Sequence, residues 1–389
     1  MARCKASRTL ACRMKLAPAR QAAFAALLSV DRGGWSAESL AAKSVQLEPR
    51  DAALASDIVF GTLRRRGELD AVIAQFSRLP VSKLDPAVRI ALEIAIYQMR
   101  FLDRVPAHAA VNDSVELVRR AGKSSAASFV NAVLRKAGGD SGDLSEALST
   151  PEWLRERWAA QYGNELAEGI AHTSLEPPGR FIRVGEAEPL AGAVPTEIPG
   201  CYLLATGDPQ GFRFQDISSQ AVVPLLELRP GMSFLDVCAA PGNKTAQALE
   251  SGAKVIACEL HESRARGLKG SGAPIVVADA TRPLPFAARF DRILVDAPCS
   301  GTGTLSRNPE IKWKLKASDI EDLSRRQKAI LGNALSLLAP GGLLVYSTCS
   351  LEREENEDVI ASAAAKVVST MHRVPGRDSG DGFFAAVLA

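Results

Sequence analysis

The sequence has no hydrophobic run that approaches the roughly 18 apolar residues needed to cross a bilayer. It also has no Cys-x-x-Cys pair, and its four histidines lie far apart, so we expect no metal site. The seven cysteines are odd in number and scattered through 389 residues. This pattern argues against a disulfide framework and favours a reducing compartment. We therefore expect a cytoplasmic protein that has neither a metal nor a membrane partner.

The remaining composition is that of an ordinary globular protein, with 47% hydrophobic and 23% charged residues. The net charge of +3 hides an asymmetry, because basic side chains exceed acidic ones in residues 1–150 and acidic ones exceed basic ones in the remainder. A basic front half favours contact with a polyanion, and the rear half is then the place for chemistry. Residues 1–15 are basic and lack a secretory apolar region, so we expect a disordered tail, with a transit peptide as the alternative and Met14 as a candidate start.

The chain divides into segments of different pattern. Apolar residues recur at three- and four-residue spacing across residues 16–140, which predicts a bundle of five or six short helices. The Gly-rich stretch Ala137–Gly142 marks a boundary. Residues 150–215 predict a small α+β connector with one helix from Pro151 to about His172. Residues 216–389 then alternate between strand and helix, which indicates an α/β domain with a mostly parallel sheet.

The strands of this last segment place acidic side chains at one edge of the sheet. Strands are predicted at 232–237, 254–259, 275–278, 291–296 and 342–347, with a closing strand at 382–388. Asp236 and Glu259 lie at the ends of the first two strands, and Asp279 directly follows the third. Ligands of open α/β sheets bind at the carboxyl ends of the strands. These acids are therefore candidates for an amine, a ribose and an adenine edge, although each taken alone is more simply a helix cap.

The first loop of the sheet lacks the G-x-G-x-x-G pattern of dinucleotide binders, since Gly242 is its single glycine. Without a phosphate clamp, the acids at the strand ends fit S-adenosylmethionine better than NAD. The residues themselves therefore predict a cofactor site at Asp236, Glu259, Asp279 and the loop that contains Gly242.

Two cysteines follow the last two parallel strands. Cys299 lies in Asp296-Ala-Pro-Cys-Ser, and Cys349 lies in Ser347-Thr-Cys-Ser. A thiolate that adds to C6 of cytosine makes C5 nucleophilic enough to accept a methyl group, and a nearby carboxylate can bind the N3/N4 edge of the ring. One cysteine alone is more simply a small buried hydrophobe. The pair, each followed by serine, favours a two-thiol cycle with Asp296 in the same pocket.

Four motifs carry a resemblance to a known family. Asp236-Val-Cys-Ala-Ala-Pro-Gly242, Asp296-Ala-Pro-Cys-Ser-Gly-Thr-Gly303, Arg307-Asn-Pro-Glu-Ile-Lys-Trp313 and Tyr346-Ser-Thr-Cys-Ser-Leu-Glu-Arg-Glu-Glu-Asn-Glu357 occur in the order seen in the Nol/Nop/Sun family of RNA cytosine-C5 methyltransferases. Residues 150–389 resemble the Rossmann-like catalytic region of that family, and the helical front half resembles a NusB-like RNA-binding domain. The whole arrangement is similar to that of bacterial enzymes that methylate 16S ribosomal RNA.

The resemblance implies roles that the residues alone leave open. Cys349 corresponds to the attacking nucleophile and Cys299 to the cysteine that assists product release. The resemblance implies a cofactor-binding set of Asp236, Cys238, Ala239, Ala240, Pro241, Gly242, Asn243, Lys244, Glu259, Asp279 and Asp296. Lys244 also corresponds to a lysine near the active centre. The sequence departs from the family at Asn243, where a second glycine is usual. Asparagine tolerates left-handed dihedral angles, so we expect only a modest effect on cofactor affinity.

The implied partner is RNA, with 16S ribosomal RNA as the first candidate and a monomeric enzyme as the expected state. The same chemistry on transfer RNA is one alternative, and a non-catalytic RNA-binding assembly factor is another. Both thiols and Asp296 are intact, which disfavours the assembly factor. A base must leave its stack to receive a thiol, so the target is an unstacked or flipped nucleotide. Candidate phosphate contacts are the basic clusters Arg64, Arg65 and Arg66; Arg119 and Arg120; and Arg135 and Lys136, each of which can also be a solvated helix face.

Overall fold

The computed structural model describes residues 16–139 and 145–389, which form two compact units that meet in the chain between Leu148 and Ser149. Each unit has its own hydrophobic core. The predictions for the basic segment 1–15 and for residues 140–142 of the boundary lie outside the described residues. Throughout the part of the chain that the structure describes, no helix is long and apolar enough to span a membrane.

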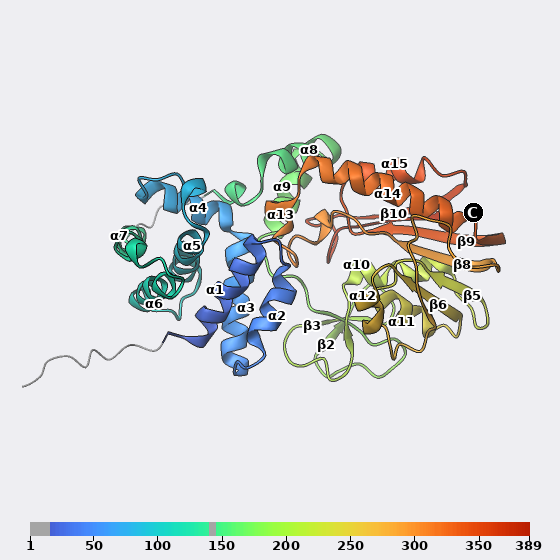
Figure 1. The fold of residues 1–389 in the computed structure, drawn as a ribbon. Helices are drawn as coiled ribbons and strands as arrows, with labels where there is room; N and C mark the ends of the chain where they lie inside the picture. The colour runs from blue at the N-terminus through green and yellow to red at the C-terminus, as the bar shows by residue number, and fades with distance from the viewer. Residues whose placement is uncertain (1–15, 140–144) are drawn as a thin grey trace, which may run out of the picture. The chain divides into compact units, whose positions relative to one another are not determined.

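The first unit, called the helical unit here, has α5 (Pro86–Phe101) at its centre (Figure 1). Almost every side chain of α5 from Ala87 to Gln98 is buried. Asp85 begins α5 as its N-cap, accepting a hydrogen bond from the backbone amide of Ala87 at 3.0 Å. The described part of this unit has more α-helices than the five or six predicted, because Arg65 alone separates α3 from α4. The helices are α1 (Pro18–Asp31), α2 (Ser36–Ser44), α3 (Pro49–Arg64), α4 (Arg66–Phe76), α5 (Pro86–Phe101), α6 (Ala107–Arg120) and α7 (Ala127–Ala137).

The second unit, called the C-terminal unit here, begins with the connector. The single helix predicted from Pro151 to His172 is wrong in detail. Gly163 has φ +83° and separates two helices, because that left-handed conformation interrupts the helix and is open to glycine at little cost. A small antiparallel sheet in the order β2-β3-β1-β4 follows. The elements are α8 (Glu152–Tyr162), α9 (Asn164–Thr173), β1 (Phe181–Arg183), β2 (Ala193–Pro195), β3 (Cys201–Leu204) and β4 (Arg213–Phe214).

A seven-stranded sheet forms the centre of the C-terminal unit, in the order β10-β11-β9-β8-β5-β6-β7 (Figure 1). Strands β5 to β9 run parallel, and β11 and β10 add an antiparallel edge. The predicted strands are all present. Only β10 was missed, because its side chains are mostly exposed and lack the apolar run of a central strand. The strands are β5 (Ser233–Asp236), β6 (Lys254–Glu259), β7 (Ile275–Val277), β8 (Phe290–Asp296), β9 (Leu338–Thr348), β10 (Val367–Arg373) and β11 (Phe383–Leu388).

Helices cover both faces of this sheet. Leu331 of α14 packs with Ile293 of β8 on one face, and Ala248 of α11 packs with Phe234 of β5 on the other. Figure 1 shows α14 and α15 on one side of the sheet and α10, α11 and α12 on the other. This doubly wound arrangement leaves the carboxyl ends of the parallel strands open as a binding edge. The helices are α10 (Ile217–Gln220), α11 (Asn243–Leu249), α12 (Glu262–Gly267), α13 (Ile311–Lys314), α14 (Ala317–Leu335) and α15 (Glu357–Ile360).

Candidate active site

The register of β8 and β9 brings the two cysteines together. The strands are parallel neighbours, and Asp296 pairs with Ser347. Both strands therefore end at the same position along the sheet edge. The loops that follow them place Sγ of Cys299 3.4 Å from Sγ of Cys349. The hydrogen bond with Cys349 raises the pKa of the Cys299 thiol well above its usual value, and burial adds to the rise. Cys299 is therefore held as a neutral thiol beside Cys349.

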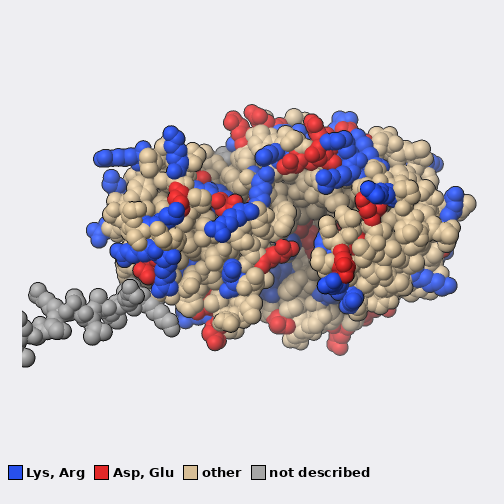
Figure 2. All heavy atoms as spheres, in the orientation of Figure 1, with Lys and Arg blue, Asp and Glu red and all other residues tan. Residues whose placement is uncertain are grey.

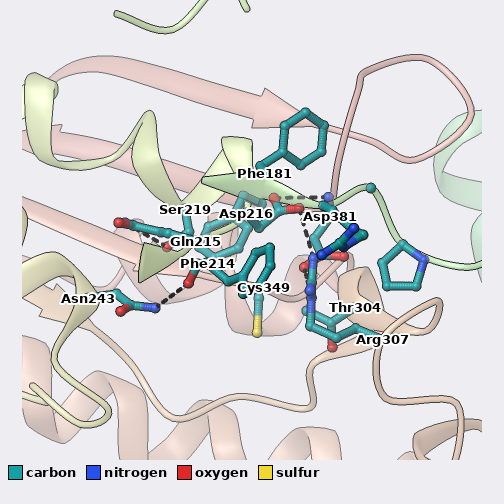
Figure 3. Close-up of a pocket in the computed structure, with 14 residues that line it drawn as sticks. Phe181, Phe214, Gln215, Asp216, Ser219, Asn243, Thr304, Arg307, Cys349 and Asp381 are labelled. Carbon is teal, nitrogen blue, oxygen red and sulfur yellow. Dashed lines mark hydrogen bonds and ion pairs between the residues drawn. The ribbon is translucent and has the colours of Figure 1, made fainter. Parts of the chain in front are cut away.

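Cys349 lines a cavity of about 450 Å³, whereas Cys299 is not among the described residues that line it. The cavity extends from the connector to the sheet edge, with Phe181 of β1 and Phe214 of β4 contributing aromatic rings (Figure 3). The full lining is Pro178, Gly179, Arg180, Phe181, Phe214, Gln215, Asp216, Ser219, Asn243, Thr304, Arg307, Cys349, Asp381 and Phe383. A cavity of this size, with aromatic walls and a thiol, can hold a single planar base.

Arg307 is one of two arginines that line this cavity, the other being Arg180, and two carboxylates hold Arg307 in place. Its Nε lies 3.0 Å from Asp381 and its Nη2 lies 3.2 Å from Asp216, as the dashed lines in Figure 3 show. Burial, followed by the charge of Asp216, raises the pKa of Asp381 to about 7. The guanidinium is thus fixed in orientation beside the thiol.

The loop after β5 forms a smaller cavity of about 70 Å³ next to the first. Ser219 and Asn243 line both, so the two cavities adjoin. The predicted loop residues Cys238, Ala239, Ala240, Pro241, Asn243 and Lys244 line the smaller one, together with Ser219, Asp236 and Asp296. Gly242 has φ +106°, a backbone conformation suited to glycine, directly before α11. The thiol cavity and the loop cavity are therefore placed to hold two reactants side by side.

Asp296 and Lys244 form an ion pair in the lining of the loop cavity. Nζ of Lys244 lies 2.7 Å from Oδ2 of Asp296, and Oγ of Ser347 donates to Oδ1 at 2.8 Å. The ammonium also lies 4.8 Å from the centre of the Phe383 ring. Sequence reasoning named Lys244 and Asp296 but missed Ser347 and Phe383. Strand register alone would have flagged Ser347, because it pairs directly with Asp296.

Asp236 is almost completely buried at the end of β5. Its Oδ2 accepts a hydrogen bond from Thr245 at 2.6 Å, while Oδ1 has no hydrogen-bond partner among the described residues. Burial raises the pKa of this carboxyl to about 7. A buried acceptor without a partner is costly, so its presence at the loop cavity fits a ligand that supplies a donor or a positive charge there.

The other predicted acids lie further along the same edge. Glu259 ends β6, is buried, and accepts from the amide of His261 at 3.0 Å. Asp279 follows β7, is half-buried, and lines a separate cavity of about 470 Å³ that Leu260 also lines. Hydrogen bonds from Thr281 lower the pKa of Asp279. The structure thus brings Asp236, Lys244 and Asp296 together and places Asp279 apart from them.

The three predicted basic clusters of the helical unit differ in their exposure to solvent. Arg119 and Arg120 in the last turn of α6 are exposed, as are Arg135 and Lys136 of α7, and basic side chains are spread over the visible face of this unit (Figure 2). The prediction of an exposed basic cluster at Arg64, Arg65 and Arg66, at the α3–α4 junction, is wrong. Arg64 and Arg66 are 8% and 7% exposed, and Nε of Arg66 lies 3.5 Å from the buried Glu93.

Arg65, between them, bonds to Glu68 and lies over the Phe101 ring. The sequence showed three consecutive charges and suggested an exposed cluster, but the buried acids of α4 and α5 turn this junction inward. The RNA contact predicted for Arg64, Arg65 and Arg66 is therefore disfavoured, and the exposed residues of α6 and α7 carry that prediction.

Comparisons with known proteins agree with both units. The NusB family matches residues 17–138, and the 16S rRNA methyltransferase RsmB/F family matches residues 223–369. Ribosomal RNA small subunit methyltransferase B of Xylella fastidiosa is 34% identical, with 93% of this chain and 97% of that protein covered. The protein of the same description from Thermus thermophilus is also 34% identical, with 91% and 89% covered.

Two solved structures share the fold. The crystal structure of PH0851 has a TM-score of 0.80 at 23% identity, covering 95% of this chain and 98% of that one. The crystal structure of NSun6 from Pyrococcus horikoshii with SFG has a TM-score of 0.54 at 20% identity, covering 61% and 97%. The fold and the site together define a Rossmann-like methyltransferase joined to a NusB-like helical domain, which confirms the predicted fold class.

The similarity to curated relatives over most of both chains is more specific. The chain belongs to the RsmB/F family, among the proteins described as ribosomal RNA small subunit methyltransferase B.

Proposed function

We propose that this protein transfers a methyl group from S-adenosylmethionine to C5 of a cytosine in 16S ribosomal RNA, through a covalent bond between Cys349 and C6. The observation that carries the proposal is the pair of thiols at 3.4 Å, with Cys349 in a base-sized cavity that adjoins the loop cavity at Asp296 and Lys244. The substrate class rests on the relatives described as ribosomal RNA small subunit methyltransferases.

Cysteine chemistry suits this reaction because C5 of cytosine is a weak nucleophile. Sγ of Cys349 forms a bond to C6, and the electron pair of the C5–C6 double bond moves into the ring, so that C5 gains enamine character. S-adenosylmethionine supplies the methyl group that C5 accepts. Water then accepts the C5 proton, the electron pair of the C5–H bond restores the C5–C6 double bond, and the C6–sulfur bond breaks with its electron pair on Sγ of Cys349.

Asp296 and Lys244 serve the ring during these steps. The carboxylate of Asp296 is an acceptor for the N4 amino group of cytosine, and Ser347 and Lys244 fix its orientation. Addition of a thiolate at C6 places negative charge on the pyrimidine. The ammonium of Lys244, held 2.7 Å from Asp296, offsets that charge without having to reorganise.

The residues of the sheet edge fit the proposed cofactor. The unpartnered Oδ1 of Asp236 is an acceptor for an amine or a sulfonium-bearing ligand, and the loop 238–244 lines the cavity beside it. Glu259, at the end of the next strand, is our candidate for the ribose hydroxyls. Asp279, which lines a separate cavity further along the same edge, is our candidate for an adenine edge. The fold neighbour solved with SFG, an analogue of S-adenosylmethionine, supports this assignment.

Base-resolved mapping of methylation tests the substrate. Bisulfite sequencing of 16S ribosomal RNA and transfer RNA from a strain that lacks the gene should show one lost 5-methylcytosine in the ribosomal RNA and none in transfer RNA. A plasmid copy should restore the site, and a copy carrying Asp296→Asn should not. Loss confined to transfer RNA would overturn the substrate proposal, and an unchanged pattern in both RNAs would favour the non-catalytic assembly factor.

The exposed arginines of α6 test the RNA role of the helical unit. Arg119→Ala combined with Arg120→Ala should weaken RNA binding and reduce its salt dependence. Each lost phosphate contact lowers the slope of log K against log salt by about 0.7 for single-stranded RNA. Lys43→Ala combined with Lys83→Ala removes the same charge from exposed sites on the same unit and should preserve the slope. Equal slopes in the two double variants would contradict a specific contact at α6.

A further inference from the structure

Each of the two cysteines is followed by a serine, and the structure gives these serines a shared partner. Ser300 and Ser350 are buried, and their hydroxyl oxygens lie 3.1 Å apart. Ser350 donates to Oε2 of Glu355 at 2.5 Å, and the hydroxyl of Ser300 donates to the same oxygen. The amide of Ser300 donates to Oε1 at 2.9 Å. One carboxylate therefore joins the loop that carries Cys299 to the loop that carries Cys349.

Glu355 is itself held from several sides. Nε2 of Gln327 on α14 donates to Oε1 of Glu355 at 2.9 Å, and it also donates to the carbonyl of Pro298 at 2.9 Å. The hydroxyl of Tyr346 donates to the backbone carbonyl of Glu355 at 2.6 Å. Helix α14, strand β9 and both cysteine loops thus meet at this side chain. Any shift of the carboxylate would disturb both loops at once.

The charge of Glu355 makes this arrangement costly as a purely structural device. The side chain is fully buried, and no lysine or arginine pairs with it among the described residues. Burial raises its pKa above the usual value, while the hydrogen bonds from Ser300 and Ser350 act in the opposite direction. Stability alone does not favour an unpaired buried carboxylate over a neutral group. Such costs are characteristic of residues that serve a site.

We propose that Glu355 is a positioning residue that holds the Cys299 and Cys349 loops in the register at which the two sulfurs meet. Its carboxylate accepts from both serines, so it acts on the separation of the loops at the residues next to the sulfurs, in addition to the direct hydrogen bond from the Gly303 amide to the Cys349 carbonyl at 2.9 Å. The consequence for catalysis rests on the proposed function, because release of the product needs Cys299 beside Cys349. The geometric part concerns the thiols alone and can be tested without RNA.

The electrostatic effect of Glu355 on Cys299 also supports a role at the two thiols. After the hydrogen bond with Cys349, burial and the influence of Cys349 itself, the charge of Glu355 is a further cause of the raised pKa of Cys299. The buried phenol of Tyr346, Cys238 and Asp296 are further titratable groups around Cys299 and Glu355. Glu355 thus favours the neutral thiol at Cys299, which is the form that can donate a hydrogen bond to the sulfur of Cys349.

Thiol oxidation measures the geometry directly. Diamide takes two electrons and two protons from a pair of adjacent thiols and leaves a disulfide, which peptide mass spectrometry can locate. In the full-length protein, the Cys299–Cys349 disulfide should form at least about tenfold more slowly in Glu355→Ala than in the unsubstituted chain, because a fixed pair of thiols reacts far faster than an unfixed one. Ser350→Ala, which removes one hydrogen bond and keeps the carboxylate, should show a smaller decrease.

Glu352→Gln is the matched control. Glu352 is equally buried in the same segment, but its side chain bonds to Trp158 and Arg157 and not to either serine. Its substitution should lower the melting temperature and leave the oxidation rate unchanged. An unchanged rate in a folded Glu355→Ala protein would overturn the proposal. If Glu355→Ala does not fold, an unchanged rate in Ser350→Ala would do so.

The kinetics of methyl transfer are the second test of the positioning role of Glu355. Glu355→Gln should lower kcat with little change in the KM for RNA or for S-adenosylmethionine, and a covalent protein–RNA adduct should accumulate although Cys299 is present. A rise in KM alone would contradict a positioning role. If Glu355→Ala oxidises slowly but the unsubstituted protein methylates no RNA, the positioning role stands and the proposed function is rejected. The two failures are therefore distinguishable.

Discussion

Replacement of Cys349 by alanine is expected to abolish methyl transfer while S-adenosylmethionine still binds. The variant lacks the sulfur that adds to C6, and no other described thiol lines the 450 Å³ cavity. Loss of a covalent nucleophile removes an entire pathway, so activity should fall by about four orders of magnitude or more. The loop cavity does not include Cys349, so the cofactor Kd from calorimetry should stay within about twofold, below 0.5 kcal/mol.

Cys201→Ala is the control for this loss. Cys201 is buried in β3 of the connector, packs in a cluster with Phe181 and Ile217, and lines neither the thiol cavity nor the loop cavity, so its removal tests the effect of losing a buried cysteine outside the thiol pair. We expect its methylation rate to match that of the unsubstituted protein after correction for the folded fraction. Substantial activity in Cys349→Ala would contradict the assignment of the nucleophile.

Replacement of Cys299 by alanine has the second large expected effect, which is the opposite in kind. The Cys349–C6 bond should still form and C5 should still receive its methyl group, because Cys349 and Asp296 are intact. Release should fail or slow greatly, because the departing sulfur loses the neutral thiol that lies 3.4 Å away and donates a hydrogen bond to it. The adduct should appear on a denaturing gel as a slow band that protease removes.

The double variant Cys299→Ala with Cys349→Ala separates adduct formation from other forms of tight binding. It should bind RNA and form no slow band, because it lacks the sulfur that bonds to C6. If Cys299→Ala turns over a competent RNA at the normal rate and no adduct is detected, Cys299 has no role in release and the proximity of the two sulfurs needs another explanation.

Much of the fold was predictable because its signals are local. Apolar runs of strand length separated by helical patterns predicted the central strands of the C-terminal unit, and three- and four-residue spacing predicted the helical unit. The errors occurred where a local signal was missing or misleading. Strand β10 is exposed and has no apolar run, and Gly163 breaks a pattern that otherwise continues as one helix. Arg64 and Arg66 look like surface charges until the burial of Glu93 is known.

The candidate site shows the same division. Cys299, Cys349, Asp236 and Asp296 were identifiable because strands that end in acids or thiols deliver them to one edge of a sheet. Their partners were not identifiable in this way. Thr245 bonds to Asp236, and the carboxylate of Glu355 bonds to both serines. Such contacts depend on how loops pack after the sheet has formed.

The sequence by itself determined the identity of the reactive groups and their placement at strand ends, because residue chemistry and strand periodicity are both read along the chain. Only the tertiary structure decided that the two sulfurs are neighbours, because the parallel register of β8 and β9 pairs Asp296 with Ser347 and the loops that follow bring together cysteines 50 positions apart. It also decided which basic residues are exposed and that one buried carboxylate links the two thiol loops. Distances between segments far apart in sequence are set by packing, and no local pattern encodes them.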